Sequence, residues 1–263
     1  MDTNLLSRFS LKDKDIWVVG AAGYLGQSIV ALLNECGARV LCIDIEDRAD
    51  TFIKSLEKNS NLTAATLNTR DSGASVTFVS QQVASRGVPH GYIDLSYAST
   101  SKTFDDLTAD DFDSVNHNGL TSTFIISREV GNVMKIKRAG NMVLFSSMYG
   151  SVSPDPNVYE SPMNVNPIEY GVGKAGIVQM TRYLAVHYAK HNVRCNCISP
   201  GPFPNPAVQQ SHPEFISRLS KKVPLGRVGR QEEVAGAAVF LISEAASFIT
   251  GQNLFVDGGW TSW

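Results

Sequence analysis

The sequence predicts an α/β fold: a single domain built on a doubly wound parallel sheet of about seven strands, with helices on both faces. Short apolar runs alternate along the chain with longer segments of helical periodicity. The first apolar run ends at a glycine-rich turn that opens a helix. The chain has 263 residues, of which 43% are hydrophobic, and this is enough for one large core.

The start of the chain fits one strand–helix–strand unit. Residues 16–19 form an apolar run, residues 26–34 carry an apolar helical stripe, and residues 40–43 form a second run closed by Asp44. Parallel strands need such a crossover, and apolar runs without alternation are typical of strands buried on both faces.

The same reasoning assigns the remaining elements. Further strands are expected at residues 62–67, 92–95, 142–145, 193–198 and 253–256. Helices are expected at residues 47–61, 76–85, 108–112, 120–137, 173–191, 213–222 and 232–243, and irregular loops at 148–169 and 200–206. Ligands of such a sheet bind at the carboxyl ends of its strands.

Composition excludes several classes of function. The net charge of -2 and the lack of a basic run argue against nucleic acid. No run of about eighteen apolar residues and no secretory signal is seen, so we expect a cytoplasmic protein without a membrane span. The five histidines do not cluster with acids at ligand spacing, so no metal site is expected.

The glycine turn predicts a dinucleotide site. Gly20, Gly23 and Gly26 follow a buried strand and open a helix, so the backbone can approach a pyrophosphate at the helix N-terminus. Asp44 ends the next strand, where a carboxylate would accept hydrogen bonds from the adenosine ribose and repel a 2′-phosphate. NAD is therefore preferred over NADP, although the nearby Arg48 weakens this preference. The alternatives are glycines that serve only packing and a solvated acid.

Tyr170 and Lys174 form the candidate catalytic pair. Residues four apart share one face of a helix, so the ammonium can lie beside the phenol. A positive charge within about 4–6 Å favours the phenolate of a tyrosine, whose ordinary pKa is about 10. Proton exchange at a carbinol needs such a group.

These residues, with several other motifs, resemble the single-domain form of the short-chain dehydrogenase/reductase family, which has a Rossmann-type fold. The resemblance runs from about residue 11 to residue 259. Its motifs are Tyr170-x-x-x-Lys174, Ser146-Ser147 after a strand, Val115-Asn116, residues 196–201, and residues 251–259.

The resemblance implies roles for individual residues. Tyr170 would exchange the hydroxyl proton, Lys174 would bind the nicotinamide ribose, Ser147 would hydrogen-bond the reacting oxygen, and Asn116 would hold a water that links Lys174 to solvent. Ser146 would point to the opposite side of its strand. Cofactor contacts are expected at Gly20, Gly23, Tyr24, Leu25, Gly26, Asp44, Asn68, Tyr170, Lys174, Pro200, Gly201 and Phe203.

Four departures from the family pattern stand out. The glycine spacing G-x-x-G-x-x-G is more usual in the sugar-nucleotide-modifying branch, and Ser96-Tyr97-Ala98-Ser99 replaces the usual Asn-Asn-Ala-Gly. Asn68 stands where an Asp commonly contacts adenine. The segment between Ser147 and Tyr170 is longer than usual by about ten residues.

That long segment gives the substrate prediction. It carries Tyr149, Tyr159 and many hydroxyl, amide and carboxylate groups, which suit a sugar, sugar acid or polyol. Asn205 would contact the nicotinamide amide or the substrate from the opposite wall, in a lid that runs to about residue 225. The alternatives are a 3-oxoacyl-thioester reductase, with a basic patch of Lys221, Lys222, Arg227 and Arg230, and a non-catalytic dinucleotide-binding scaffold or sensor.

Partners are expected to be copies of the same chain. The apolar face of the helix at 173–191 is wide, and the family commonly pairs this helix, so we expect a homodimer or homotetramer. Trp260 and Trp263 lie near the end of the chain, and we expect both to be buried in a subunit interface or against a neighbour's pocket.

Overall fold

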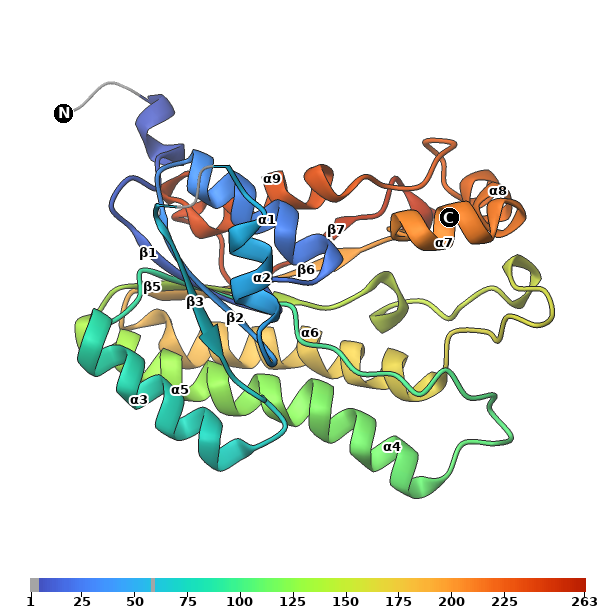
Figure 1. The fold of residues 1–263 in the computed structure, drawn as a ribbon, viewed down its shortest axis with the longest axis horizontal. Coiled ribbons are helices and arrows are strands. Elements are labelled where there is room, and N and C mark those ends of the chain that lie inside the picture. The colour runs from blue at the N-terminus through green and yellow to red at the C-terminus, as the bar shows by residue number, and fades with distance from the viewer. Residues whose placement is uncertain (1–4, 58–59) are drawn as a thin grey trace.

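The computed structural model describes residues 5–57 and 60–263, and it confirms the predicted doubly wound sheet. Seven parallel strands lie in the order β3-β2-β1-β4-β5-β6-β7 (Figure 1). The direction of winding reverses between β1 and β4, so both strands end beside one crevice. The strands are β1 Asp15–Val19, β2 Arg39–Asp44, β3 Leu62–Thr66, β4 Gly91–Asp94, β5 Gly140–Phe145, β6 Val193–Pro200 and β7 Asn253–Val256.

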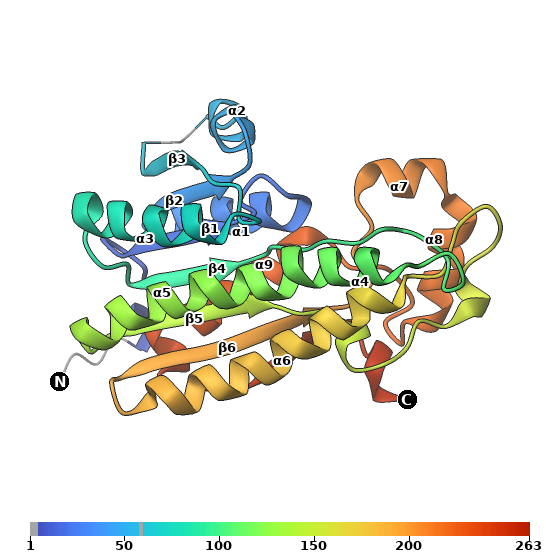
Figure 2. The ribbon, with the colours of Figure 1, turned by 90° about the horizontal axis from the view of Figure 1, so that it is seen from below.

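Helices cover both faces of this sheet. One layer holds α1 and α9, which pack against each other, and the other layer holds α3, α5 and α6, which lie side by side (Figures 1 and 2). The helices are α1 Tyr24–Glu35, α2 Arg48–Lys54, α3 Ser72–Arg86, α4 Ala109–Asn116, α5 Ser122–Lys137, α6 Ile168–Ala189, α7 Pro206–Ser211, α8 Pro213–Lys222 and α9 Gln231–Ile242.

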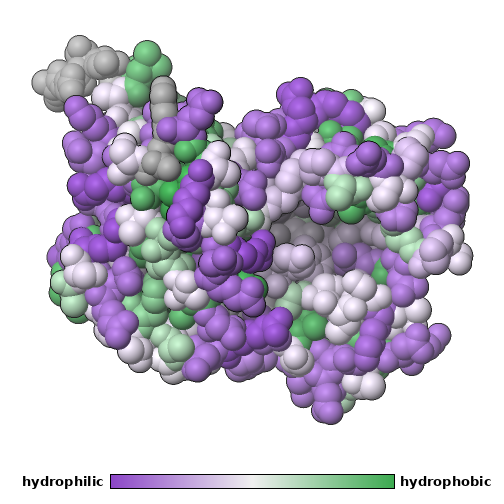
Figure 3. All heavy atoms as spheres, in the orientation of Figure 1, coloured by the Kyte–Doolittle hydropathy of each residue, from purple (hydrophilic) through white to green (hydrophobic). Residues whose placement is uncertain are grey.

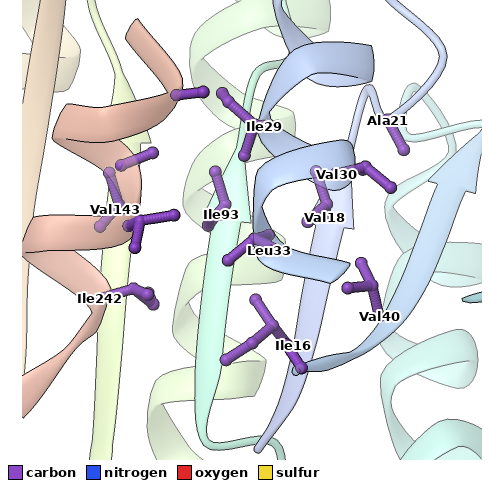
Figure 4. Packing of buried hydrophobic residues seen from close by; sticks show 14 of the residues in the cluster. Ile16, Val18, Ala21, Ile29, Val30, Leu33, Val40, Ile93, Val143 and Ile242 are labelled. Atoms are coloured by element: carbon purple, nitrogen blue, oxygen red, sulfur yellow. The ribbon is translucent and has the colours of Figure 1, made fainter. Parts of the chain in front are cut away.

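The two faces of the sheet bury separate hydrophobic clusters. Under α1 and α9, Val18 of β1 packs with Ile29 and Leu33 of α1 (Figure 4). On the other face, Trp17 and Tyr92 pack with the helices α3, α5 and α6. Full burial of one such aliphatic side chain stabilises the fold by about 1.5–3 kcal/mol. Both clusters hold the strands rigidly, so the positions of the strand ends are fixed.

Several helix boundaries differ from the sequence prediction, among them the end of α2, which lies at Lys54 and not at residue 61. A π turn, His117–Thr121, joins α4 to α5 directly after Asn116. Helix α6 begins at Ile168, earlier than the expected residue 173, because Pro167 fixes an extended residue just before it. Helix α7 was not predicted; it begins at Pro206, the last residue of the expected loop, where Asn205 caps it and Pro206 occupies its first turn.

A third cluster joins the expected lid to the end of the chain. Met148, Val158, Leu219 of α8 and Trp260 pack together in it. Trp260 is only 7% exposed within its own chain, so its predicted burial in a subunit interface is wrong. Asp257 holds the turn by accepting hydrogen bonds from the backbone N–H of Gly259 and of Thr261. Trp263 is 79% exposed in this chain.

Within residues 5–57 and 60–263, no helix is both long and apolar enough to cross a membrane.

Candidate active site

The predicted site residues stand at one edge of the sheet. Val19 pairs with both Ile43 and Asp94, and Phe145 pairs with Ile198, so the carboxyl ends of these strands are aligned. Loops from β1, β2, β4, β5 and β6 therefore meet there. Figure 3 shows a hollow on this side of the molecule, beside the region of α7 and α8.

The backbone of the glycine turn is packed so closely that a side chain on Gly26 would collide with it. Gly20 has φ +78°, a conformation that favours glycine, and a Cβ on Gly26 would lie 2.2 Å from the carbonyl oxygen of Gly20. Gly23 precedes α1 and has no side chain to cap its first N–H groups. Tyr24 and Leu25 begin the helix. This arrangement fits a pyrophosphate at the N-terminus of α1.

Asp44 is a buried carboxylate next to this turn. Its Oδ2 accepts a 2.9 Å hydrogen bond from the backbone N–H of Ala22, and its Oδ1 accepts one from Ile45. Arg48 forms a 3.2 Å ion pair with Oδ1, and the arginine side chain is 48% exposed. A cation therefore stands beside the acid that we expect to bind the ribose, which bears directly on the choice between NAD and NADP.

The other predicted cofactor contacts frame the same edge. Asn68 is exposed, and its Oδ1 accepts a 3.2 Å hydrogen bond from the backbone N–H of Arg70. Pro200 ends β6, and the N–H of Gly201 donates to the carbonyl of Val256. A Cβ on Gly229 would collide with Phe203, so the backbone there lies directly against this ring.

Neighbouring serines at the end of β5 point in different directions. The hydroxyl of Ser146 donates a 2.8 Å hydrogen bond to the backbone carbonyl of Lys174 and so ties β5 to α6. The hydroxyl of Ser147 accepts a 3.2 Å hydrogen bond from Tyr149 N–H, and Ser147 also interacts with the phenol of Tyr170. Only the second serine is therefore available to the reacting oxygen.

Lys174 is buried beneath the site. Its Nζ donates to the carbonyls of Phe145, at 2.7 Å, and Ser96, at 3.1 Å, and lies 5.8 Å from the centre of the Tyr170 ring. Burial lowers the pKa of this ammonium to about 8. The lysine is thus held at a fixed point and close to its titration range.

Burial acts in the opposite direction on Tyr170. Loss of hydration raises the pKa of this phenol above its ordinary value, and the interaction with Ser147 lowers it in part. In the protein alone, burial outweighs the lowering by Lys174 that the helical spacing predicts. The phenol is therefore a proton donor at neutral pH, which is the form needed for ketone reduction.

Asn116 has an unused acceptor in the interior. It ends α4 where the π turn begins, and its Nδ2 donates to the carbonyl of Phe112 at 3.0 Å. Its Oδ1 is buried beside Gly173 of α6 and has no partner within residues 5–57 and 60–263. π turns are frequent at functional sites, and this acceptor suits the water-holding role that the resemblance implies.

Tyr149 and Tyr159 meet on the substrate side. Their hydroxyl oxygens lie 2.8 Å apart, and the Tyr159 ring packs on Phe215 of α8 with centroids 5.5 Å apart. Burial raises the pKa of both phenols, so both stay protonated. Asn205 instead uses its side-chain oxygen to cap α7 at Val208.

The long segment before Tyr170 is tied to α8 by charged groups. Arg218 donates from Nε to the carbonyl of Val158 at 2.8 Å and pairs with Glu160 at 2.9 Å. Lys222, at the end of α8, pairs with Asp155. The segment and α8 are thereby linked on the expected substrate side of the site.

Two buried acids near the catalytic pair had no predicted role. Glu169, next to Tyr170, is fully buried; its Oε1 accepts from Thr100 N–H and Oγ1, and its Oε2 has no partner in the described part of the chain. Asp94 is buried at the end of β4. In the sequence, Asp94 lies within an expected strand and Glu169 at the end of an expected loop, and neither position reveals a buried acid beside Lys174 or Tyr170.

The residues present fit a nicotinamide dinucleotide. The glycine turn would hold the pyrophosphate, Asp44 the ribose of adenosine, and Lys174 the nicotinamide ribose; the bound nicotinamide would supply or accept hydride. The described residues contain no group of three or more potential metal ligands.

Comparisons with known proteins agree with this architecture. A family model described as enoyl-(acyl carrier protein) reductase matches residues 20–261. The NAD-dependent glycerol dehydrogenase of Listeria innocua is 29% identical over 258 residues, covering 96% of this chain and 96% of that protein. The NADP-dependent mannitol dehydrogenase of Hypocrea jecorina is 31% identical over 270 residues, covering 98% and 96%.

A solved structure extends the agreement to three dimensions. The short chain dehydrogenase from Leptospira borgpetersenii with bound NAD+ has a TM-score of 0.86 and 30% identity, covering 97% of this chain and 95% of that chain. The strand-end site and these matches together show that the chain belongs to the short-chain dehydrogenase/reductase family and is an oxidoreductase acting on CH–OH groups.

Proposed function

We propose that this protein is an NAD-dependent dehydrogenase or reductase that interconverts a secondary alcohol and a ketone on a sugar, sugar acid or polyol. The observation that carries the proposal is the grouping of Ser147, Tyr170 and Lys174 at one strand end, with Lys174 held by two carbonyls. In reduction, Tyr170 donates its proton to the substrate oxygen, and Ser147 hydrogen-bonds that oxygen as charge develops on it.

Lys174 and Asn116 support this proton transfer. The ammonium of Lys174 stabilises the phenolate that remains on Tyr170 after the transfer. The free Oδ1 of Asn116 can hold a water in the interior, and such a water would return a proton from solvent toward Lys174. In oxidation the same groups run the steps in reverse.

The preference for NAD rests on Asp44. Its carboxylate lies beside the glycine turn and would repel a 2′-phosphate. Arg48 pairs with the same carboxylate, so part of this repulsion is offset. Both cofactors occur among the relatives, and the preference follows from the burial and position of the acid.

The substrate class rests on the polar wall. Tyr149 and Tyr159 place two protonated hydroxyl groups 2.8 Å apart on the segment that follows Ser147. A hydroxyl-rich substrate can exchange further hydrogen bonds with such a pair, whereas a steroid or an acyl chain would offer it few additional partners. Asn205 remains a predicted contact from the opposite wall, provided that its cap on α7 is released.

The description of the matching family model favours a second candidate, reduction of an acyl thioester. An acidic carrier protein would need free cations at the entrance. Lys222 pairs with Asp155, and Arg227 and Arg230 both pair with Glu233. Three of the four predicted basic groups are therefore neutralised by neighbours, which makes this candidate weaker.

We further propose a homodimer or homotetramer that works in the cytoplasm. Val172, Tyr183 and Val186 of α6 are 44%, 68% and 81% exposed, which leaves an apolar face for a second copy of this helix. All four cysteines are free thiols, as a reducing compartment favours. Light scattering after gel filtration measures the oligomeric state.

The decisive experiment is an assay of NADH formation by absorbance. Purified protein is given NAD or NADP with aldoses, sugar acids, polyols and a 3-hydroxyacyl thioester. NAD-linked activity on a sugar-type alcohol supports the proposal. Activity with only the thioester supports the second candidate, and tight NAD binding without any turnover supports a dinucleotide sensor.

A further inference from the structure

Asp94 stands under the catalytic lysine as a buried acid. It is the last residue of β4, in the middle of the sheet, and only 1% exposed. Its Oδ2 accepts a 2.6 Å hydrogen bond from the phenol of Tyr92. A carboxylate in such a place is costly unless it is hydrogen-bonded and faces a positive charge.

One peptide unit joins this acid to Lys174. The backbone N–H of Ser96 donates a 2.8 Å hydrogen bond to Oδ1 of Asp94. The carbonyl of the same residue accepts a 3.1 Å hydrogen bond from Nζ of Lys174. The Asp94 carboxylate thus holds the Ser96 backbone in place, and the carbonyl of Ser96 in turn accepts the hydrogen bond from the Lys174 ammonium.

The surroundings of Lys174 make Asp94 its principal counter-charge. Burial lowers the pKa of Lys174, and Asp94 is the main group that raises it, followed by the thiol of Cys197 on β6. The ring of Tyr170, on the same helix, faces the ammonium of Lys174. One carboxylate oxygen of Glu169 accepts a hydrogen bond from the backbone N–H of Thr100. Within the described residues, no acid hydrogen-bonds Nζ directly.

Tyr92 is the side chain that hydrogen-bonds Asp94. Tyr92 is fully buried, and its phenol lies near Cys195 of β6. Burial and the neighbouring Asp94 raise the pKa of Tyr92 far above neutrality, so it remains a hydrogen-bond donor. Lys174 is therefore the titrating group that responds to the charge on Asp94 between about pH 6 and 10.

We propose that Asp94 is a positioning residue for proton transfer: it fixes the Ser96 peptide that holds Lys174, and its negative charge keeps the buried lysine protonated. This role rests on the proposed function, in which the lysine ammonium binds the nicotinamide ribose and stabilises the Tyr170 phenolate. This proposal also gives a role to Ser96, the first residue of the Ser96–Ser99 segment that replaces the family's usual Asn-Asn-Ala-Gly.

The test is the pH dependence of NADH binding, followed by NADH fluorescence, which needs no substrate. Wild-type affinity should fall as Lys174 loses its proton, with a break near pH 8, the pKa to which burial lowers it. Lys174→Met should abolish this break and so assign it. Asp94→Asn should move the break to lower pH by about one unit, because the counter-charge is lost.

Asparagine is a fair substitute at this site. Its Oδ1 can still accept from Ser96, and the Tyr92 hydroxyl can turn to accept from Nδ2. Asp15→Asn is the matched control, because Asp15 is also buried, begins β1 at the end of the sheet away from the site, and pairs with Arg86. It should lower thermal stability and leave the pH break in place.

Each outcome bears on the inference. An Asp94→Asn protein that folds and keeps the wild-type break overturns it. If that variant does not fold, the pH at which wild-type NADH affinity falls decides the matter. A fall above about pH 7 supports a lysine whose charge is stabilised by Asp94. A fall below about pH 7 indicates a buried lysine without a counter-charge and overturns the inference. Failure of the wild-type protein to bind NADH overturns the proposed function, and this inference with it.

Discussion

The carboxylate of Asp44 accepts a 2.9 Å hydrogen bond from the backbone N–H of Ala22, so the acid that ends β2 braces the glycine turn that follows β1. The same acid pairs with Arg48. Cofactor choice and the shape of the glycine turn are therefore coupled through one side chain.

Asp44→Ala should shift the ratio of NADH to NADPH affinity toward NADPH by about tenfold, equivalent to about 1.4 kcal/mol. The substitution removes the repulsion of a 2′-phosphate and releases Arg48 to bind it. Fluorescence titration with each cofactor measures the ratio. Asp50→Ala is the control, because Asp50 pairs with Lys54 on α2. An unchanged ratio in Asp44→Ala would contradict the assigned role of the acid.

Tyr170→Phe should reduce turnover by about 10²–10⁴-fold, because the proton donor is removed, while NADH still binds. Initial rates and NADH titration separate the two effects. Tyr183→Phe, on the exposed side of the same helix, should behave as wild type. If Tyr170→Phe turns over normally, the catalytic assignment is wrong.

The serine pair offers a matched comparison. Ser147→Ala should lower turnover by about 10²–10³-fold, because a hydrogen bond to the reacting oxygen is lost. Ser146→Ala removes the bond to the Lys174 carbonyl and should mainly cost about 1 kcal/mol of unfolding free energy. Turnover and urea denaturation distinguish them, and a reversed pattern would exchange their roles.

Arg218→Ala should raise the KM of the alcohol substrate a few-fold, since an exposed ion pair is worth about 0–1 kcal/mol and the bond to Val158 is lost as well. NADH affinity should be unchanged, because Arg218 contacts only the substrate-side wall. Arg227→Ala, which breaks a pair with Glu233, is the control. A loss confined to NADH affinity would place Arg218 on the cofactor side.

Much of the fold follows from burial patterns that are visible in the sequence. Strands such as β1 are buried on both faces, so their apolar runs are unbroken, and Asp44 marks a strand end. The start of α6 was hidden by the Pro- and Asn-rich segment before it, and α7 by a proline that begins a helix instead of breaking one.

Sequence reasoning could not identify site residues whose roles depend on contacts between distant parts of the chain. Trp260 looked like an interface residue because its partners Met148, Val158 and Leu219 are far away in sequence. Asp94 could not be recognised, because its importance depends on a contact between Ser96, just after β4, and Lys174 of α6, which is far away in the sequence. Tyr170 and Lys174 were found because their relationship is local to one helix.

The packing of Trp260 has a practical consequence for protein engineering. The last turn of the chain packs on Leu219 of α8 through Trp260, whereas the described N-terminal end lies at the opposite end of the molecule (Figure 1). A purification tag or fused reporter at the C-terminus would lie close to this cluster, and we expect it to disturb the packing of α8 against Met148 and Val158. Attachment before Leu5 should leave kinetics unaltered.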